Sequence, residues 1–289
     1  MVCTRSRTAT RLSGVDSDNV ASMVSLTLRH IARRAGLNRT RVATGRMCCE
    51  RHILAALGRP HRRWIGRILC YHSIGQEQWG VNDVSPVNFR RHIELALEAG
   101  YRFVPASHIA RTGGGPQDLA ITFDDGLRSL LTVAAPILKD YGLPWTFFPV
   151  SSWSDNPDGF GEGVLLGWRD IETLMAAGGE LGSHSATHPD FGKIGLPQML
   201  DELSGSREVF EKRLGLAPDT FAIPLGQSAN WKPASADLAH QAGYRIIYAQ
   251  AEATRPQGTI PRTFITRFDG DWIFKAVLEG KFDRWEEWV

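Results

Sequence analysis

The chain has 289 residues, enough for one large domain or two ordinary ones, and its composition is that of a soluble globular protein. The net charge of +2 is unevenly distributed, because residues 1–69 hold fourteen arginines and three acidic residues, while acidic residues predominate in residues 70–289. No run of about 18 apolar residues is present, which excludes a transmembrane helix, and the four cysteines fit neither a disulfide framework nor a common zinc spacing.

Residues 1–66 are predicted to form a basic N-terminal extension, partly helical or disordered, ahead of a domain that spans residues 67–289. The arginines would suit an acidic surface, but an appendage without a role explains them as well, so no nucleic-acid partner is expected. No export signal is evident in this segment, which favours a cytoplasmic location. No feature of the sequence specifies an oligomeric state.

Regular alternation of strands and helices begins near residue 67. Residues 68–71 predict a strand that ends at His72, and Ser85 followed by Pro86 predicts the start of a helix. Further strands are predicted at 101–104, 119–123, 145–150, 180–183, 220–223, 244–249 and 259–267. Further helices are predicted at 168–177, 197–214, 234–242 and 272–278. This alternation is typical of an α/β fold with a parallel sheet or barrel.

The strand at residues 119–123 runs directly into Asp124, Asp125 and Gly126. Its unbroken apolar character predicts burial on both faces, and the carboxyl ends of such parallel strands are where ligand sites form. Neighbouring side chains of a strand point in different directions, so one carboxylate can bind a metal while the other meets a substrate. A plain turn after the strand is the alternative.

A second polar stretch contains His184 and His188. Two histidines at this spacing lie on the same side of a helical turn, and both imidazoles can then reach one ion. Such pairs also occur by chance on solvated helices. With one added carboxylate they would form a site of two histidines and one aspartate, which leaves positions open for water and substrate.

Taken together, the segments Thr122–Gly126 and His184–His188 resemble the polysaccharide deacetylase family, also called the NodB-homology domain or carbohydrate esterase family 4. The resemblance runs in order over residues 67–267. The chain is most similar to the poly-N-acetylglucosamine deacetylase branch, because it has an early Tyr71–His72 pair and a Phe-Ala-Ile-Pro segment at residues 221–224.

This resemblance implies a distorted (β/α) barrel, a divalent ion and the removal of acetyl groups from an N-acetylglucosamine-type poly- or oligosaccharide. The ion is usually zinc, with cobalt, manganese or nickel as options. Carried over to this sequence, the metal ligands are Asp125, His184 and His188, and Asp124 is the general base. The backbone N–H of Leu225 would help the metal to hold the oxyanion.

The chain departs from the family pattern in two places. Ala222 stands where the family has an arginine that contacts the base, and no histidine follows near the C-terminus to act as the acid. Within the resemblance, His72 therefore takes the role of the acid, and Arg262 orients Asp124. The alternatives are a strand-end histidine bonded to backbone and a surface arginine.

Three other side chains receive a simpler interpretation. Trp168 resembles a tryptophan that the family places near the site, although core packing would explain it equally. His92 and His108 are expected to be ordinary surface residues.

Two other functions stay open. One is a metal-dependent amidase that acts on a small non-sugar amide. The other is a non-catalytic carbohydrate-binding protein, which Ala222 and the missing late histidine would suit. Acetate release from acetylated glycans, compared with hydrolysis of small amides, separates all three.

Overall fold

The computed structural model describes residues 39–250 and 255–285. The chain divides into two compact units, residues 1–47 and residues 48–289, and the fold below is that of the second. Helix α2 (Arg39–Leu57) runs across this division. The disorder predicted for the start of the chain lies outside the described residues, and the domain boundary at residue 67 stays a prediction.

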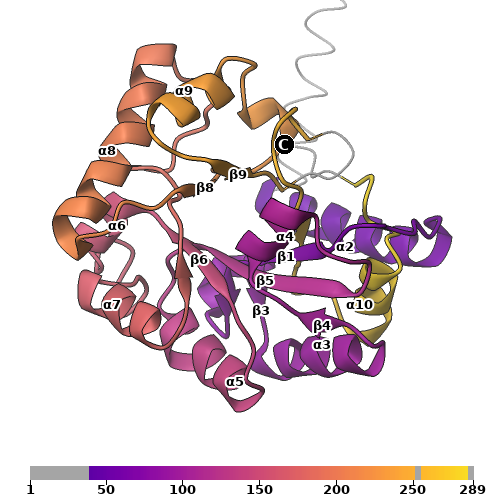
Figure 1. The fold of residues 1–289 in the computed structure, drawn as a ribbon. Helices are drawn as coiled ribbons and strands as arrows, with labels where there is room; N and C mark the ends of the chain where they lie inside the picture. Colours follow the sequence, from indigo (N-terminus) through magenta and orange to yellow (C-terminus); the bar gives the residue numbers. More distant parts are fainter. Residues whose placement is uncertain (1–38, 251–254, 286–289) are drawn as a thin grey trace, which may run out of the picture. The chain divides into compact units, whose positions relative to one another are not determined.

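A parallel sheet forms the centre of the second unit (Figure 1). Its order is β10 (Thr263–Phe264), β1 (Arg67–Tyr71), β5 (Asp118–Asp125), β6 (Thr146–Pro149) and β7 (Glu180–Leu181), and β4 (Arg102–Phe103) also pairs with β5. Every pair is parallel, so the carboxyl ends of the strands meet at one edge. The predicted parallel α/β fold is confirmed.

Two further strands extend the parallel arrangement. The strands β8 (Thr220–Ala222) and β9 (Ile246–Tyr248) pair with each other, and single parallel bridges join Ser183 to Phe221 and Tyr248 to Ile260. Parallel pairing thus continues from β7 through β8 and β9 to the segment just before β10. Such a continuous series of parallel strands is what a distorted (β/α) barrel would have.

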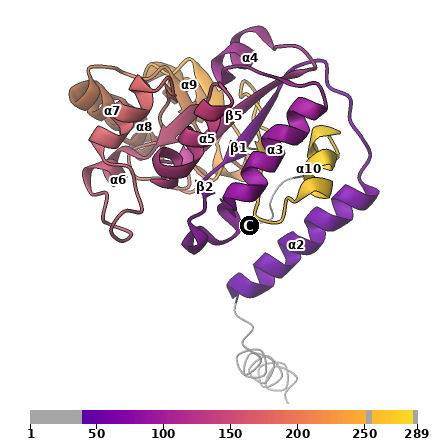
Figure 2. The same cartoon turned by 90° about the horizontal axis from the view of Figure 1, so that it is seen from below.

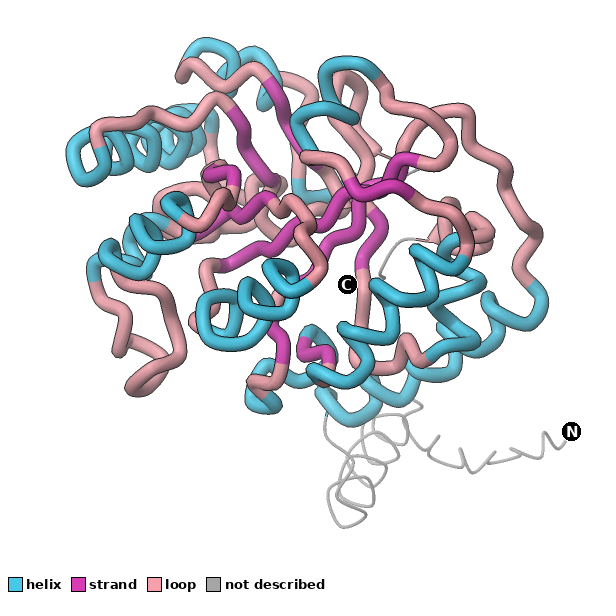
Figure 3. The backbone as a smooth tube through the Cα atoms, turned by 60° about the horizontal axis from the view of Figure 1, so that its bottom comes forward, coloured by secondary structure: helices cyan, strands magenta, loops and turns pink. Residues whose placement is uncertain are grey.

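The helices surround the strands (Figure 3). They are α3 (Pro86–Glu98), α4 (Ala106–Thr112), α5 (Ala135–Asp140), α6 (Ser151–Asp155), α7 (Trp168–Ala176), α8 (Leu196–Leu214), α9 (Ser235–Gln241) and α10 (Asp271–Leu278). The short elements are β2 (Ser73–Ile74), η1 (Glu77–Asn82), β3 (Asp83–Val84), the π-helical η2 (Leu130–Ala134) and η3 (Ser228–Asn230). No helix within the described ranges has the length and apolar character needed to cross a bilayer.

Helix α3 shows how the local sequence produces packing. Ser85 caps its first turn by accepting a hydrogen bond from the backbone N–H of Asn88 at 3.2 Å, as the sequence predicts. Its apolar face carries Phe89 and Ile93 into the main core, where Phe89 lies 5.9 Å from Phe123 of β5. Burial of each such side chain contributes about 1.5–3 kcal/mol. Figure 2 shows α3 beside α10, which it contacts.

The prediction that His92 is a surface residue is wrong, whereas His108 is exposed as expected. His92 is buried on the inner face of α3, where its ring stacks on Phe274 at 4.1 Å. Its Nδ1 lies 3.0 Å from the Tyr71 hydroxyl, and its Nε2 contacts the backbone oxygen of Asp269. Because both ring nitrogens have partners, the polar ring is accommodated in the core.

Candidate metal and catalytic site

The strand β5 delivers two carboxylates to the carboxyl edge of the sheet. All of its residues are buried, from Asp118 to Asp125, as the unbroken apolar run predicts. The backbone turns at Asp125 (φ 71°) and Gly126 (φ 79°). A Cβ atom at Gly126 would lie 2.8 Å from the Cβ of Pro149, so only glycine fits there.

Asp125, His184 and His188 converge on one point. The Oδ1 atom of Asp125 lies 3.5 Å from the Nε2 atom of each imidazole, and the two rings are 4.9 Å apart. Within the described part of the chain, this Oδ1 is buried and has no hydrogen-bond partner. A buried carboxylate oxygen without a donor, facing two imidazole nitrogens, is the arrangement that a cation would satisfy.

The expectation that the two histidines share a helical turn is wrong. Residues 182–190 form no helix, and the backbone is left-handed at Ser185 (φ 72°) and His188 (φ 62°). The Ser185 hydroxyl accepts the N–H of His188 at 2.9 Å, while the Glu202 carboxylate of α8 accepts the N–H groups of residues 186 and 187. These two side chains accept the backbone N–H groups of a tight loop, and this loop brings the two imidazoles together. Glu202 does so from a segment that is distant in the sequence.

The surroundings of His184 leave its ring neutral. Burial lowers its pKa to about 4, even though the carboxylates of Asp124 and Asp125 raise it. Its Nδ1 lies 2.8 Å from the backbone oxygen of Ala222. Because a carbonyl oxygen can only accept a hydrogen bond, Nδ1 must carry the proton and donate it. The lone pair is therefore on Nε2, the atom that faces Asp125, as metal coordination requires.

The Oδ2 atom of Asp124 lies 3.9 Å from Nε2 of His184, and the Asp124 carboxylate faces the Arg262 guanidinium. The two groups form a buried bidentate ion pair, with nitrogen–oxygen distances of 2.6 and 2.7 Å. The Cys70 thiol lies 3.4 Å from Asp124 Oδ2 and donates to it; burial raises the pKa of this thiol, which keeps its proton. Burial alone would raise the pKa of Asp124, but Arg262 and His184 lower it well below its ordinary value. Asp124 is thus ionised at neutral pH.

His72 lies beside this carboxylate, directly after β1. One of its ring nitrogens is within 4.8 Å of both the Asp124 carboxylate and the Cys70 sulfur. Its ring packs edge-on against Phe264 at 5.4 Å, and among the described residues its buried Nδ1 has no hydrogen-bond partner. The structure therefore brings His72 and Arg262 to Asp124 from opposite ends of the domain sequence.

The other two predicted site residues are Leu225 and Trp168, and they lie in different surroundings. Leu225 is 44% exposed in the turn after β8, with a left-handed backbone (φ 64°). Trp168 packs against Phe210 at 5.6 Å, and its indole N–H donates to Asp155 at 2.9 Å. No contact between Trp168 and the three converging residues is found among the described residues.

Sequence reasoning missed three aromatic side chains at the edge of the site. The Trp79 indole N–H donates to Asp125 Oδ2 at 3.3 Å, and the Trp153 ring lies 5.4 Å from the His188 ring. Phe160 contacts both tryptophans, at 5.9 and 4.9 Å. Trp153 lies in the short helix α6, which begins soon after β6 ends.

A parallel α/β fold with two carboxylates, two imidazoles and a buried arginine at the carboxyl edge of its sheet thus defines the molecule. Its relatives are consistent with this class. The sequence profile of the family described as "Polysaccharide deacetylase" matches residues 112–247. The chain is therefore similar to the polysaccharide deacetylase family over residues 112–247, which confirms the resemblance seen in its motifs.

Individual proteins show the same similarity. The Bacillus subtilis protein YxkH is 24% identical over 198 residues, which are 66% of this chain and 67% of YxkH. A poly-beta-1,6-N-acetyl-D-glucosamine N-deacetylase of Escherichia coli O157:H7 is 30% identical over 115 residues, and the match covers 37% of this chain but 17% of that protein. Among solved structures, the Streptococcus pyogenes deacetylase PplD in complex with acetate superposes with a TM-score of 0.62 at 20% identity, covering 76% of this chain and 98% of PplD. The structural likeness confirms the fold.

Proposed function

We propose that this protein is a metal-dependent hydrolase that removes N-acetyl groups from an N-acetylglucosamine-type poly- or oligosaccharide. The observation that carries the proposal is the buried, unpartnered Oδ1 of Asp125, 3.5 Å from the Nε2 atoms of His184 and His188. The family and the aromatic side chains at the edge of the site support it.

Asp125, His184 and His188 would hold the metal ion. One carboxylate and two imidazoles suit zinc best, and cobalt, manganese and nickel accept the same donors. When bound, such an ion polarises an amide carbonyl and lowers the pKa of a water molecule. The Trp79 indole, by donating to Oδ2 of Asp125, orients the carboxylate so that Oδ1 faces the imidazoles.

The second group of residues would handle the protons. Asp124 is ionised and fixed by Arg262, so it can accept a proton from the attacking water. His72, close to Asp124, can donate a proton to the leaving amine. In this proposal the N–H of Leu225 donates to the oxyanion, and Arg262 takes the place of the arginine that Ala222 lacks. The contact between Arg262 and Asp124 thereby weakens the case for a non-catalytic protein.

The rim of the site supports this substrate class. Trp79, Trp153 and Phe160 form a contiguous aromatic surface next to His188, and Phe160 is 52% exposed. Aromatic faces pack well on the apolar faces of sugar rings, whereas a small amide would not need them. The E. coli relative, named for a poly-N-acetylglucosamine substrate, supports the same choice.

Acetate release from acetylated chitooligosaccharides and poly-N-acetylglucosamine tests the proposal, with small N-acetylated amides as competing substrates. We expect the purified chain to release acetate from the glycans, to lose this activity in chelator and to regain it with zinc. The Asp124→Asn variant should be inactive yet retain metal. Turnover by Asp124→Asn would rule out the assigned base, and preference for small amides would favour the amidase.

A further inference from the structure

A cavity lies at the opposite edge of the sheet from the candidate site. It has a volume of about 320 Å³ and is lined by the connector between α2 and β1, the first residue of β1, the segment before β5 and the end of α10. The strands β1 and β5 are parallel, and Arg67, which lines the cavity, pairs with Leu119 at the start of β5. Asp124 and Asp125 end the same strand, about 20 Å away at 3.3 Å per residue.

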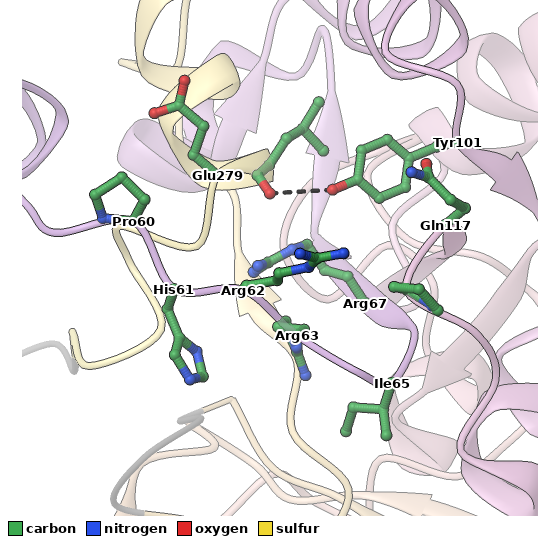
Figure 4. A pocket seen from close by; sticks show the side chains of 11 residues that line it. Pro60, His61, Arg62, Arg63, Ile65, Arg67, Tyr101, Gln117 and Glu279 are labelled. Atoms are coloured by element: carbon green, nitrogen blue, oxygen red, sulfur yellow. Dashed lines mark hydrogen bonds between the residues drawn. The ribbon is translucent and has the colours of Figure 1, made fainter.

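Basic side chains predominate among the polar residues that line this cavity (Figure 4). His61, Arg62, Arg63 and Arg67 face it, against one carboxylate, that of Glu279. We call this cavity the basic pocket. Like charges that converge in one cavity repel one another unless a counter-charge is present, so the arrangement is typical of an anion site.

The acidic groups around the basic pocket are already bound to cations. Glu279 forms an ion pair with Lys281 at 3.1 Å. Asp283 lies 2.6 Å from Arg67 Nη1 and 3.0 Å from His61 Nδ1. These contacts use the available carboxylates without reaching Arg62.

Two guanidinium groups have N–H donors that can still bind a ligand. Arg67 is buried, and within the described ranges its Nε has no hydrogen-bond partner. Arg62 makes no ion pair with any described residue; its guanidinium lies 5.1 Å from the centre of the Trp64 ring. A buried N–H without an acceptor is costly, and an oxygen ligand would satisfy it.

The other residues that line the cavity indicate what the rest of the ligand is like. Tyr101, Pro116 and Ile65 contribute apolar surface, and the Tyr101 hydroxyl is occupied by a hydrogen bond to the backbone oxygen of Leu278 at 3.0 Å. Gln117 adds an amide that can donate or accept. The cavity can therefore hold a compact organic body next to the cationic groups.

We propose that the basic pocket binds a small molecule through an oxyanion group, such as a phosphate, which is held by Arg62 and by the free Nε of Arg67. The bound anion would link the connector to β1. Since it binds only the folded chain, it would also raise the midpoint of thermal unfolding.

Calorimetric titration of the full chain with inorganic pyrophosphate tests this site, with Arg62→Glu, Arg62→Lys and Arg169→Glu as variants. Arg169 is an exposed arginine of α7 outside the pocket, so it controls for general charge. We expect saturable binding to the wild type, a loss of affinity of at least about tenfold in Arg62→Glu, and a smaller loss in Arg62→Lys, which keeps the charge but not the planar fork.

Circular dichroism spectra and acetate release check that each variant is folded, and Arg62 is exposed enough for substitution to be tolerated. Saturable binding that Arg169→Glu leaves unchanged supports the site. Absence of saturable binding to the wild type, or an equal loss in Arg62→Glu and Arg169→Glu, overturns it.

Discussion

At the scale of single residues, the site depends on two neighbouring aspartates that have opposite surroundings. Asp125 faces two imidazoles and lacks a donor at Oδ1, whereas both oxygens of Asp124 are held by Arg262. Both carboxylates lie near Nε2 of His184, at 3.5 Å for Asp125 and 3.9 Å for Asp124, and Arg262 pairs with Asp124. The proposed roles of metal ligand for Asp125 and base for Asp124 rest on this difference in partners.

The Arg262–Asp124 pair leads to a prediction about both rate and stability. Arg262→Gln leaves a buried carboxylate without its partner, so we expect a loss of about 3–5 kcal/mol in the free energy of unfolding. The misplaced carboxylate should also reduce kcat/KM by about 100-fold. Arg262→Lys should recover part of the stability but little of the rate, since an ammonium cannot form the bidentate contact.

Urea unfolding and acetate release, measured on the same samples, check this prediction. A fully active Arg262→Gln variant would show that Arg262 has only a structural role. Equal rates for Arg262→Gln and the wild type at unequal stability would point to the same conclusion.

Phe160 allows a separate prediction about substrate length. Phe160→Ala should raise KM for an oligosaccharide by about two- to tenfold, because a stacked aromatic contact contributes about 0.5–1.5 kcal/mol. It should leave the KM for N-acetylglucosamine monomer nearly unchanged if the ring contacts a neighbouring sugar unit. Phe160→Tyr should restore the wild-type KM.

Trp272→Ala serves as the control, because Trp272 is 49% exposed on α10. Steady-state kinetics on monomer and tetramer distinguish the outcomes. An equal change of KM in Phe160→Ala and Trp272→Ala would contradict a role of Phe160 in substrate contact.

At the scale of secondary-structure elements, helix α2 is more than the appendage expected from its composition. Its residue Arg51 is fully buried in the second unit, where Nε donates to Asp269 Oδ1 at 2.8 Å and Nη2 pairs with Oδ2. The guanidinium also lies 4.2 Å from the Phe282 ring. The C-terminal half of α2 is therefore packed as part of the core structure.

Arg51→Met should destabilise the protein by about 3–5 kcal/mol, because Asp269 then stays buried without a cation. The control is Arg59→Met, at an exposed position two residues after the end of the same helix, where we expect a change within about 0.5 kcal/mol. Urea unfolding curves of the two variants provide the comparison. Similar stabilities for both would show that the buried pair makes no net contribution.

Elements that rest on local patterns were predictable from the sequence. The apolar run of β5, the Ser85 cap of α3 and the long amphipathic α8 all carry their signal within a few neighbouring residues. The loop that carries His184 and His188 was not predictable, since the Glu202 carboxylate and the oxygen of Ala222 support it from distant segments.

The same physical reason explains the wrong prediction for His92 and the unexpected burial of Arg51. A charged or polar residue in an amphipathic helix usually faces water, and only its tertiary partners reveal that it is buried. For Arg51 the partner is Asp269, 218 positions along the chain, and the backbone of the same Asp269 serves His92. The contact of Arg262 with Asp124 was expected because the resemblance to a family indicated which arginine was missing.

At the scale of the whole molecule, the buried His92 makes stability depend on pH. Burial lowers its pKa from 6.5 to about 4 in the folded chain. Between these values the unfolded chain binds more protons than the folded one, so stability rises with pH up to about 6.5 and falls as the pH decreases toward 4. Each pH unit in that window corresponds to at most about 1.4 kcal/mol from this group.

His92→Phe should therefore flatten the pH dependence of the free energy of unfolding, although it lowers stability overall because the Tyr71 hydroxyl loses its partner. Urea unfolding of wild type and variant across this pH range supplies the slopes. Parallel curves for the two proteins would mean that His92 does not titrate in this way.

The measurement that tests the central claim most directly is the metal content of the purified chain after dialysis against limiting zinc. We predict one zinc ion per chain in the wild type and in Asp124→Asn, and loss of most of it in Asp125→Ala and in His184→Ala. Undiminished zinc in Asp125→Ala and His184→Ala would contradict the assignment of Asp125, His184 and His188 as the metal ligands.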